Sequence, residues 1–236
     1  MIHYLSYDGE LSSDYGVFIS GVKTFNRPQR DRSFASIPGR NGDLIFDNGR
    51  FPNVTIQYPA FIRRDFGDQY GNFMNFLNLH TSYARLRDTY DPDVFRLAVP
   101  SGNMYPTTGP LNDSGLFALE FNAKPQRFLM SGEDTIVLLA DGSVTNPELT
   151  QARPLIRVYG SGVVGIGSGS LAIAAHSYAY MDIDCELMDA FCGAINLASY
   201  LALSGNDYPA LGRGTTNITL GVGINSVEIT PRWWRL

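Results

Sequence analysis

The stretch Ser33-Phe34-Ala35-Ser36-Ile37-Pro38-Gly39-Arg40-Asn41-Gly42-Asp43-Leu44 places two turn signals between two short apolar segments. Pro38-Gly39 is typical of a type II turn, because proline presets φ at the second position and glycine accepts a positive φ at the third. Asn41-Gly42 is a strong hairpin dipeptide. The pattern predicts the tip of a projecting β-hairpin, and local chemistry alone leaves a plain surface loop as the alternative.

Composition limits the class of protein. The chain has 236 residues, enough for one large domain or two small ones with a substantial core. Aromatic residues at 12%, with 24 glycines and 13 prolines, favour many short strands joined by tight turns. The net charge of −5 argues against general nucleic-acid binding. We expect no signal peptide and no membrane insertion, since no window approaches the roughly 20 apolar residues of a bilayer span.

Five basic side chains lie around the opening stretch of an otherwise acidic chain: Lys23, Arg27, Arg30, Arg32 and Arg40. One interpretation is a nucleic-acid site. The other is a charged strand edge that discourages wrong pairing or meets a neighbouring subunit. We favour the edge, because no aromatic residues alternate with the arginines to stack on bases.

Strands surround the hairpin on both sides. Residues 14–25 predict one strand with a kink at Gly21. After the hairpin, Asn48-Gly49 predicts a further turn. Its return strand is expected at Val54–Tyr58, bounded by Pro52 and Pro59.

One helix is predicted at about residues 65–80, with Asp65 or Asp68 as its cap. His80 follows it without a partner that the sequence identifies. Helical spacing of large apolar residues predicts a face that packs on a sheet. That face consists of Phe66, Tyr70, Phe73, Met74, Phe76 and Leu77.

Further strands follow the helix, at residues 83–90, 94–99 and 115–121. A domain boundary is expected near residue 133, which divides the chain into domains 1–133 and 134–236. The second domain is expected to be all strand and turn, with one strand at Leu155–Tyr159.

The second domain carries one long alternation. Met181, Ile183, Cys185 and Leu187 are predicted on one face, and Asp182, Asp184 and Glu186 on the solvent face. Residues 190–203 fit either a helix or strands. At the end of the chain, alternation predicts that Trp233 is core and Trp234 is not.

Motifs for chemistry are weak. Gly160–Gly165 matches the dinucleotide fingerprint, but Gly165, Gly167 and Gly169 fall at every second position, which no stable helix tolerates. We therefore interpret this stretch as glycine-rich strand and turn. The acidic row could be a metal site or a glycosidase pair, and a solvent face is the simpler interpretation. We assign no catalytic residue, no cofactor and no metal ligand. Cys185 and Cys192 are expected as free thiols.

Several short motifs resemble the phage distal tail protein family. In the first half they are Ile37–Leu44, Leu86-Arg87-Asp88 and Arg96-Leu97-Ala98. In the second half they are Pro154–Gly162, Ile183–Glu186, Tyr208–Leu211, Thr216–Ile218 and Pro231–Trp234.

The resemblance implies a mainly β protein: an N-terminal β-rich domain with one helix and a projecting hairpin, then a C-terminal galectin-like β-sandwich. It implies a structural, non-enzymatic virion protein of a long non-contractile tail, made in the host bacterial cytoplasm. The expected assembly is a homo-hexameric ring at the distal end of the tail, which joins the tail tube protein and the tail-tip hub protein. The resemblance leaves open whether receptor-binding proteins are also partners. The expected subunit interface is Ile37, Pro38, Gly39, Arg40, Asn41 and Gly42.

Two other functions stay open. One is a carbohydrate-binding module that contacts host cell-wall glycans, with Tyr178, Tyr180 or Trp234 as the stacking platform. The other is a cell-wall hydrolase that uses the acidic row. The chain has no insertion long enough for an extra carbohydrate-binding module, which argues against direct glycan binding.

Overall fold

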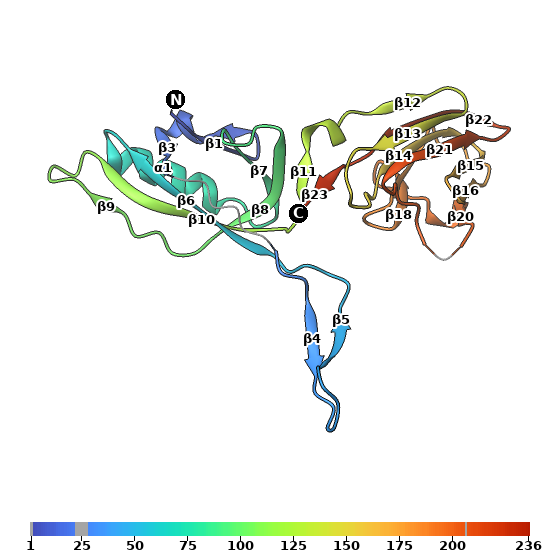
Figure 1. Cartoon of the computed structure of the whole chain (residues 1–236). Helices are drawn as coiled ribbons and strands as arrows, with labels where there is room; N and C mark the ends of the chain where they lie inside the picture. Colours follow the sequence, from blue (N-terminus) through green and yellow to red (C-terminus); the bar gives the residue numbers. More distant parts are fainter. Residues whose placement is uncertain (1, 22–27, 206) are drawn as a thin grey trace. The chain divides into compact units, whose positions relative to one another are not determined.

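The computed structural model describes residues 2–21, 28–205 and 207–236. The chain is mainly β and forms two compact units (Figure 1). The first unit extends to Arg127 and the second runs from Phe128 to Arg235, whereas the sequence placed the boundary near residue 133.

One antiparallel sheet organises the first unit. Its strands follow the order β2-β1-β7-β8-β10-β6-β3, and β9 pairs with β10. The strands are β1 (Leu5–Tyr7), β2 (Glu10–Leu11), β3 (Val17–Ile19), β6 (Val54–Ile62), β7 (Ala84–Asp88), β8 (Val94–Ser101), β9 (Thr107–Thr108) and β10 (Gly115–Ala123).

The long strands β6 and β10 form the centre of this sheet. They pair along their whole length, from Val54 opposite Ala123 to Ile62 opposite Gly115. In both strands buried and solvent-facing residues alternate, so one face of the sheet is apolar. The strands predicted at 83–90, 94–99 and 115–121 are confirmed.

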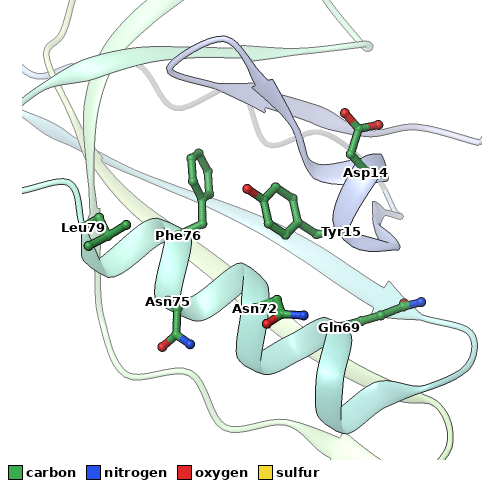
Figure 2. A pocket seen from close by; sticks show the side chains of 7 residues that line it. All are labelled: Asp14, Tyr15, Gln69, Asn72, Asn75, Phe76 and Leu79. Carbon is green, nitrogen blue, oxygen red and sulfur yellow. The ribbon is translucent and has the colours of Figure 1, made fainter.

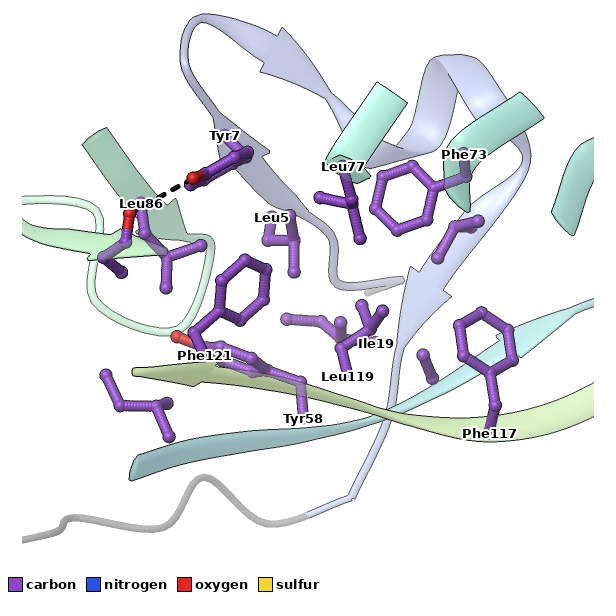
Figure 3. Close-up of a cluster of buried hydrophobic side chains, with 14 of the residues drawn as sticks. Leu5, Tyr7, Ile19, Tyr58, Phe73, Leu77, Leu86, Phe117, Leu119 and Phe121 are labelled. Atoms are coloured by element: carbon purple, nitrogen blue, oxygen red, sulfur yellow. Dashed lines mark hydrogen bonds between the residues drawn. The ribbon is translucent and has the colours of Figure 1, made fainter. Parts of the chain in front are cut away.

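The helix α1 (Phe66–Asn78) covers the apolar face, as its predicted stripe requires. Phe73 and Leu77 point from α1 into the buried cluster that also contains Leu5 and Ile19 of the sheet (Figure 3). Full burial of one large apolar side chain contributes about 1.5–3 kcal/mol to the stability of the fold. The expected side-chain cap is wrong: Asp65 has φ +50° and forms no capping bond with its carboxylate, although its carbonyl accepts the N–H of Gln69.

Two strand predictions in this unit are wrong. Residues 12–15 form a short 3-10 helix, η1 (Ser12–Tyr15), so the strand expected over 14–25 reduces to β3; residues 22–27 lie outside the described part. Strand β6 continues through Pro59. The Pro59 carbonyl accepts the Ser20 N–H at 2.8 Å. The nitrogen of Pro59 faces the same side as this carbonyl, and Ser20 lies beyond the end of β3. Proline is therefore tolerated in β6, because no carbonyl of β3 needs an N–H donor at this position.

The hairpin strands β4 (Arg32–Ala35) and β5 (Leu44–Asp47) form a separate two-stranded sheet (Figure 1). Strand β5 pairs with β4, whereas β6 pairs with β10 and β3. The prediction that β5 and β6 form a hairpin around Asn48-Gly49 is therefore wrong. The turn instead closes the base of the β4–β5 hairpin, where the Asn48 N–H donates to the Asp31 carbonyl at 3.0 Å.

The second unit is a β-sandwich, as expected. One sheet has the order β12-β22-β14-β17-β18-β19 and the other β13-β21-β15-β16-β20, and both contribute to one core. The first sheet contains β12 (Ile136–Leu138), β14 (Leu155–Gly160), β17 (Met181–Asp184), β18 (Asp189–Cys192), β19 (Ile195–Asn196) and β22 (Ile224–Thr230). The second contains β13 (Gly142–Asn146), β15 (Gly162–Ile166), β16 (Gly169–Ile173), β20 (Leu201–Leu203) and β21 (Gly214–Leu220). Short elements complete the chain: β11 (Arg127–Leu129), η2 (Met130–Gly132), η3 (Ala198–Tyr200) and β23 (Trp234–Arg235).

The structure decides the ambiguous stretches of this unit. Residues 190–203 are strands and a single 3-10 turn rather than an α-helix. The glycine-rich stretch is strand and turn, as predicted. Gly160 has φ +106°, and a Cβ there would lie 2.2 Å from the Gly223 carbonyl, so the close approach of two turns requires glycine.

The two tryptophans differ, although less than predicted. Trp233 is buried in the core, which confirms its assignment. Trp234 is half-buried against the same core, and its indole N–H donates to the Gln151 carbonyl at 2.9 Å. Strict alternation fails here because Arg232 has φ +58°, outside the extended region.

Candidate functional site: the exposed hairpin and the acidic row

The tip of the β4–β5 hairpin has the predicted turn geometry. The Arg40 N–H donates to the Ile37 carbonyl at 3.1 Å, and Gly39 has φ +80°, as the third position of a type II turn requires. Gly42 has φ +83°, and a Cβ there would meet no atom within 4 Å. Both glycines therefore serve the backbone of the turn rather than its packing.

The hairpin exposes large apolar side chains on both of its faces. Phe34 and Ile45 lie opposite each other in register and are 62% and 59% exposed. Phe46, 51% exposed, points to the other face by alternation. Clustered exposed apolar residues of this size mark interaction surfaces. The sequence located the turn but missed these flanking residues, whose apolar character was the available signal.

Ion pairs hold the base of the hairpin. Asp47 accepts from Arg30 at 2.5 Å and lies 3.9 Å from Arg32, and Asp31 accepts from Arg50 at 2.7 Å. Two hydrogen bonds lower the pKa of the Asp47 carboxyl: the larger effect comes from the backbone N–H of Gly49 and the next from the Arg30 side chain.

These contacts account for part of the basic cluster. Arg30 and Arg32 belong to the strand base, which agrees with the interpretation of a charged edge. Arg40 lies exposed at the hairpin tip. Lys23 and Arg27 lie outside the described residues.

A cavity of about 520 Å³ lies beside the helix α1 (Figure 2). Its polar lining includes Asp14, Tyr15 and three amides of α1, Gln69, Asn72 and Asn75, and the exposed Leu79 also lines it. These groups can donate and accept hydrogen bonds.

His80, which the sequence left without a partner, is held on both ring nitrogens. Its Nδ1 lies 3.0 Å from the Phe76 carbonyl and its Nε2 lies 3.1 Å from an Asp8 carboxylate oxygen. The ring also packs edge-on to Tyr7 at 4.9 Å. His80 therefore fastens the end of α1 to the β1–β2 turn.

The predicted solvent face of the acidic row is correct for Glu186, which is exposed, and wrong for Asp182 and Asp184. Asp182 and Asp184 are each only 5% exposed. Arg157 on the neighbouring strand β14 donates to both oxygens of Asp182, at 2.7 and 2.9 Å. Arg232 donates to both oxygens of Asp184, each at 2.9 Å. The two guanidinium groups cover the carboxylates and neutralise them.

Asp184 also organises the turn that follows it. Burial alone would raise its pKa, but the Arg232 bonds and the backbone N–H groups of Leu187 and Glu186 lower the pKa below its ordinary value. Strand β17 ends at Asp184, and Leu187 is 70% exposed. The prediction that Leu187 joins the core face is therefore wrong.

The two cysteines are free thiols, as expected. Cys185 lies in the core, and burial raises the pKa of its thiol to about 12. Among the described residues, no group of three or more histidine, cysteine, aspartate or glutamate side chains is arranged to hold a metal ion. Nor does the described part contain a helix with the length and apolarity needed to cross a membrane.

The arrangement of a one-helix β-sheet unit followed by a β-sandwich is a fold found in phage tail hubs and baseplates. The crystal structure of the SPP1 Dit protein, described as a paradigm of the hub adsorption apparatus in phages that infect Gram-positive bacteria, matches with a TM-score of 0.71 at 14% identity. The match covers 100% of both chains. Two structures of the activated phage p2 baseplate, with Sr and with Ca, match with TM-scores of 0.54 at 10% identity. Those matches cover 100% and 97% of this chain and 98% and 97% of theirs. No family model matches this chain, and no curated protein matches it in sequence.

Proposed function

We propose that this chain is a structural component of a phage tail, placed in the virion at the distal end of the tail tube. The full-length fold likeness to SPP1 Dit supports this role, as do the two baseplate matches. The proposed activity is assembly rather than catalysis. Its partners would be further copies of the chain, the tail tube protein and the tail-tip hub protein, with receptor-binding proteins as a further candidate.

The observation that carries the proposal is the exposed apolar hairpin. Exposed Phe34, Ile45 and Phe46 would cost solubility in a free monomer, because a cluster of exposed apolar side chains favours association. An isolated two-stranded sheet is also only marginally stable in water. Burial of these three side chains against a neighbouring subunit removes that cost. The turn residues 37–42 then lie at the proposed interface.

A ring follows if every hairpin contacts the next copy. A contact between the hairpin and a different surface of the next copy is heterologous, and it gives a closed ring when the rotation between successive copies is cyclic. We propose six copies, the number that the resemblance to distal tail proteins implies. A hexamer of this 26.0 kDa chain has a mass of about 156 kDa.

Native mass spectrometry and negative-stain microscopy test the ring. The purified chain, alone at high concentration or with its hub partner, should give the hexamer mass and an annular particle. The double variant Phe34→Ser/Ile45→Ser should fold yet stay monomeric. The matched control Leu187→Ser removes an equally exposed apolar residue from the second unit and should assemble as the parent does. A parent that stays monomeric under all conditions would refute the ring.

A further inference from the structure

The outer face of the first sandwich sheet carries an ordered polar and aromatic surface. In register, one row crosses all six strands: Val137 on β12, Glu228 on β22, Arg157 on β14, Asp182 on β17, Phe191 on β18 and Asn196 on β19. The core-facing neighbours of this row, such as Val158 and Ile183, are fully buried, so alternation places the row on the outer face.

Aromatic rings flank the arginine of this row. The Arg157 guanidinium lies 4.2 Å from the centre of the Tyr180 ring. The Tyr159 ring lies 6.2 Å from the Tyr180 ring, centre to centre. The bidentate bonds to Asp182 fix the plane of the guanidinium. The Arg157 guanidinium is therefore held in place between Asp182 and the Tyr180 ring.

Charge decides which ligand class fits. Arg157 is neutralised by Asp182 and Arg232 by Asp184, and Glu228 adds a further negative charge beside Arg157. An anionic ligand would meet a net negative surface. A free cation would find Asp182 and Asp184 already occupied by guanidinium groups. A neutral ligand that has apolar C–H faces and many hydroxyls meets neither obstacle.

We propose that Tyr159, Arg157, Tyr180 and Glu228 form a binding surface for a neutral saccharide on the outer sheet of the second unit. The tyrosine rings offer flat faces for the C–H side of a sugar ring. Glu228 and the tyrosine hydroxyls offer acceptors and donors for its hydroxyls. Of the three platform residues considered from the sequence, Tyr180 alone belongs to this surface. Tyr178 packs on the core, and the Trp234 indole is engaged by Gln151.

Saturation-transfer NMR and calorimetry on the full-length chain test the site, with lactose, cellotetraose and chitotetraose as neutral probes and heparin as the anionic probe. At least one neutral probe should saturate below about 10 mM, and heparin should not bind. Tyr180→Ala should weaken binding at least tenfold. Glu228→Gln should weaken saccharide binding several-fold. Because this substitution changes no packing volume, it tests the site even if Tyr180→Ala fails to fold. The control Tyr105→Ala, at an exposed tyrosine of the first unit, should bind as the parent does.

Three results would overturn the inference: no saturable binding of the neutral probes, preference for heparin, or unchanged binding by both site variants. A chain that forms rings and binds none of the saccharides would refute this inference and leave the proposed function intact.

Discussion

Replacement of Asp184 by asparagine tests the buried ion pair that the sequence did not reveal. Asparagine keeps the shape and an acceptor oxygen for the N–H groups of Glu186 and Leu187, but it removes the charge that faces Arg232. Loss of one partner from a fully buried pair costs about 3–5 kcal/mol. The Arg232 side chain is 26% exposed and can recover some hydration, so we expect a loss of roughly 2–3 kcal/mol in the free energy of unfolding.

Urea unfolding followed by tryptophan fluorescence measures this loss in the second unit, because both tryptophans of the chain, Trp233 and Trp234, lie there. The matched control is Asp207→Asn. Asp207 is 71% exposed and lies 3.8 Å from Arg153, so its removal should cost less than about 1 kcal/mol.

The effect of Asp184→Asn should also depend on pH. The folded-state pKa of Asp184 is lowered relative to the unfolded chain, so its contribution is present above the unfolded pKa, near 4. That contribution is lost as pH falls through the folded pKa. The gap in stability between parent and variant should therefore be full at pH 7 and shrink progressively below about pH 4. A gap no larger than that of the Asp207 control, or one that stays constant through this window, would refute the reasoning.

Three further predictions concern packing, thiol reactivity and assembly. Trp233→Ala should cost roughly 3–5 kcal/mol in thermal or urea unfolding, whereas Trp234→Ala should cost clearly less because Trp234 is only half-buried; equal losses would contradict this. At pH 8, a thiol reagent should modify Cys192 long before Cys185, because burial raises the Cys185 thiol pKa to about 12; mass spectrometry of the labelled peptides identifies the order. Gly42→Val forces a β-branched residue to φ +83°, at a cost of about 1–3 kcal/mol in the exposed turn. We expect this variant to keep its circular dichroism and lose ring formation, and normal rings would show that the turn is only a surface loop.

Much of the fold could be predicted because its signals are local. The period of two in β6 and β10, the apolar stripe of α1 and the Pro38-Gly39 turn each depend on neighbours within a few residues. The candidate site was predicted in part for the same reason. The turn dipeptides located the hairpin tip at residues 37–42, but they could not show that Phe34, Ile45 and Phe46 stay uncovered.

By itself, the sequence determined the mainly β character, the single described helix, the hairpin and the two faces of each strand, since backbone dihedrals and side-chain periodicity follow from adjacent residues. The tertiary structure alone decided which strands pair and what covers each face. Strand β5 could have paired with β6, and the pairing of β5 with β4 and of β6 with β10 and β3 shows that it does not. Alternation assigned Asp182 and Asp184 to the outer face correctly, but it could not show that Arg157 and Arg232, distant in the chain, lie over them. Whether a carboxylate meets water or a guanidinium depends on long-range packing, and no local pattern encodes that packing.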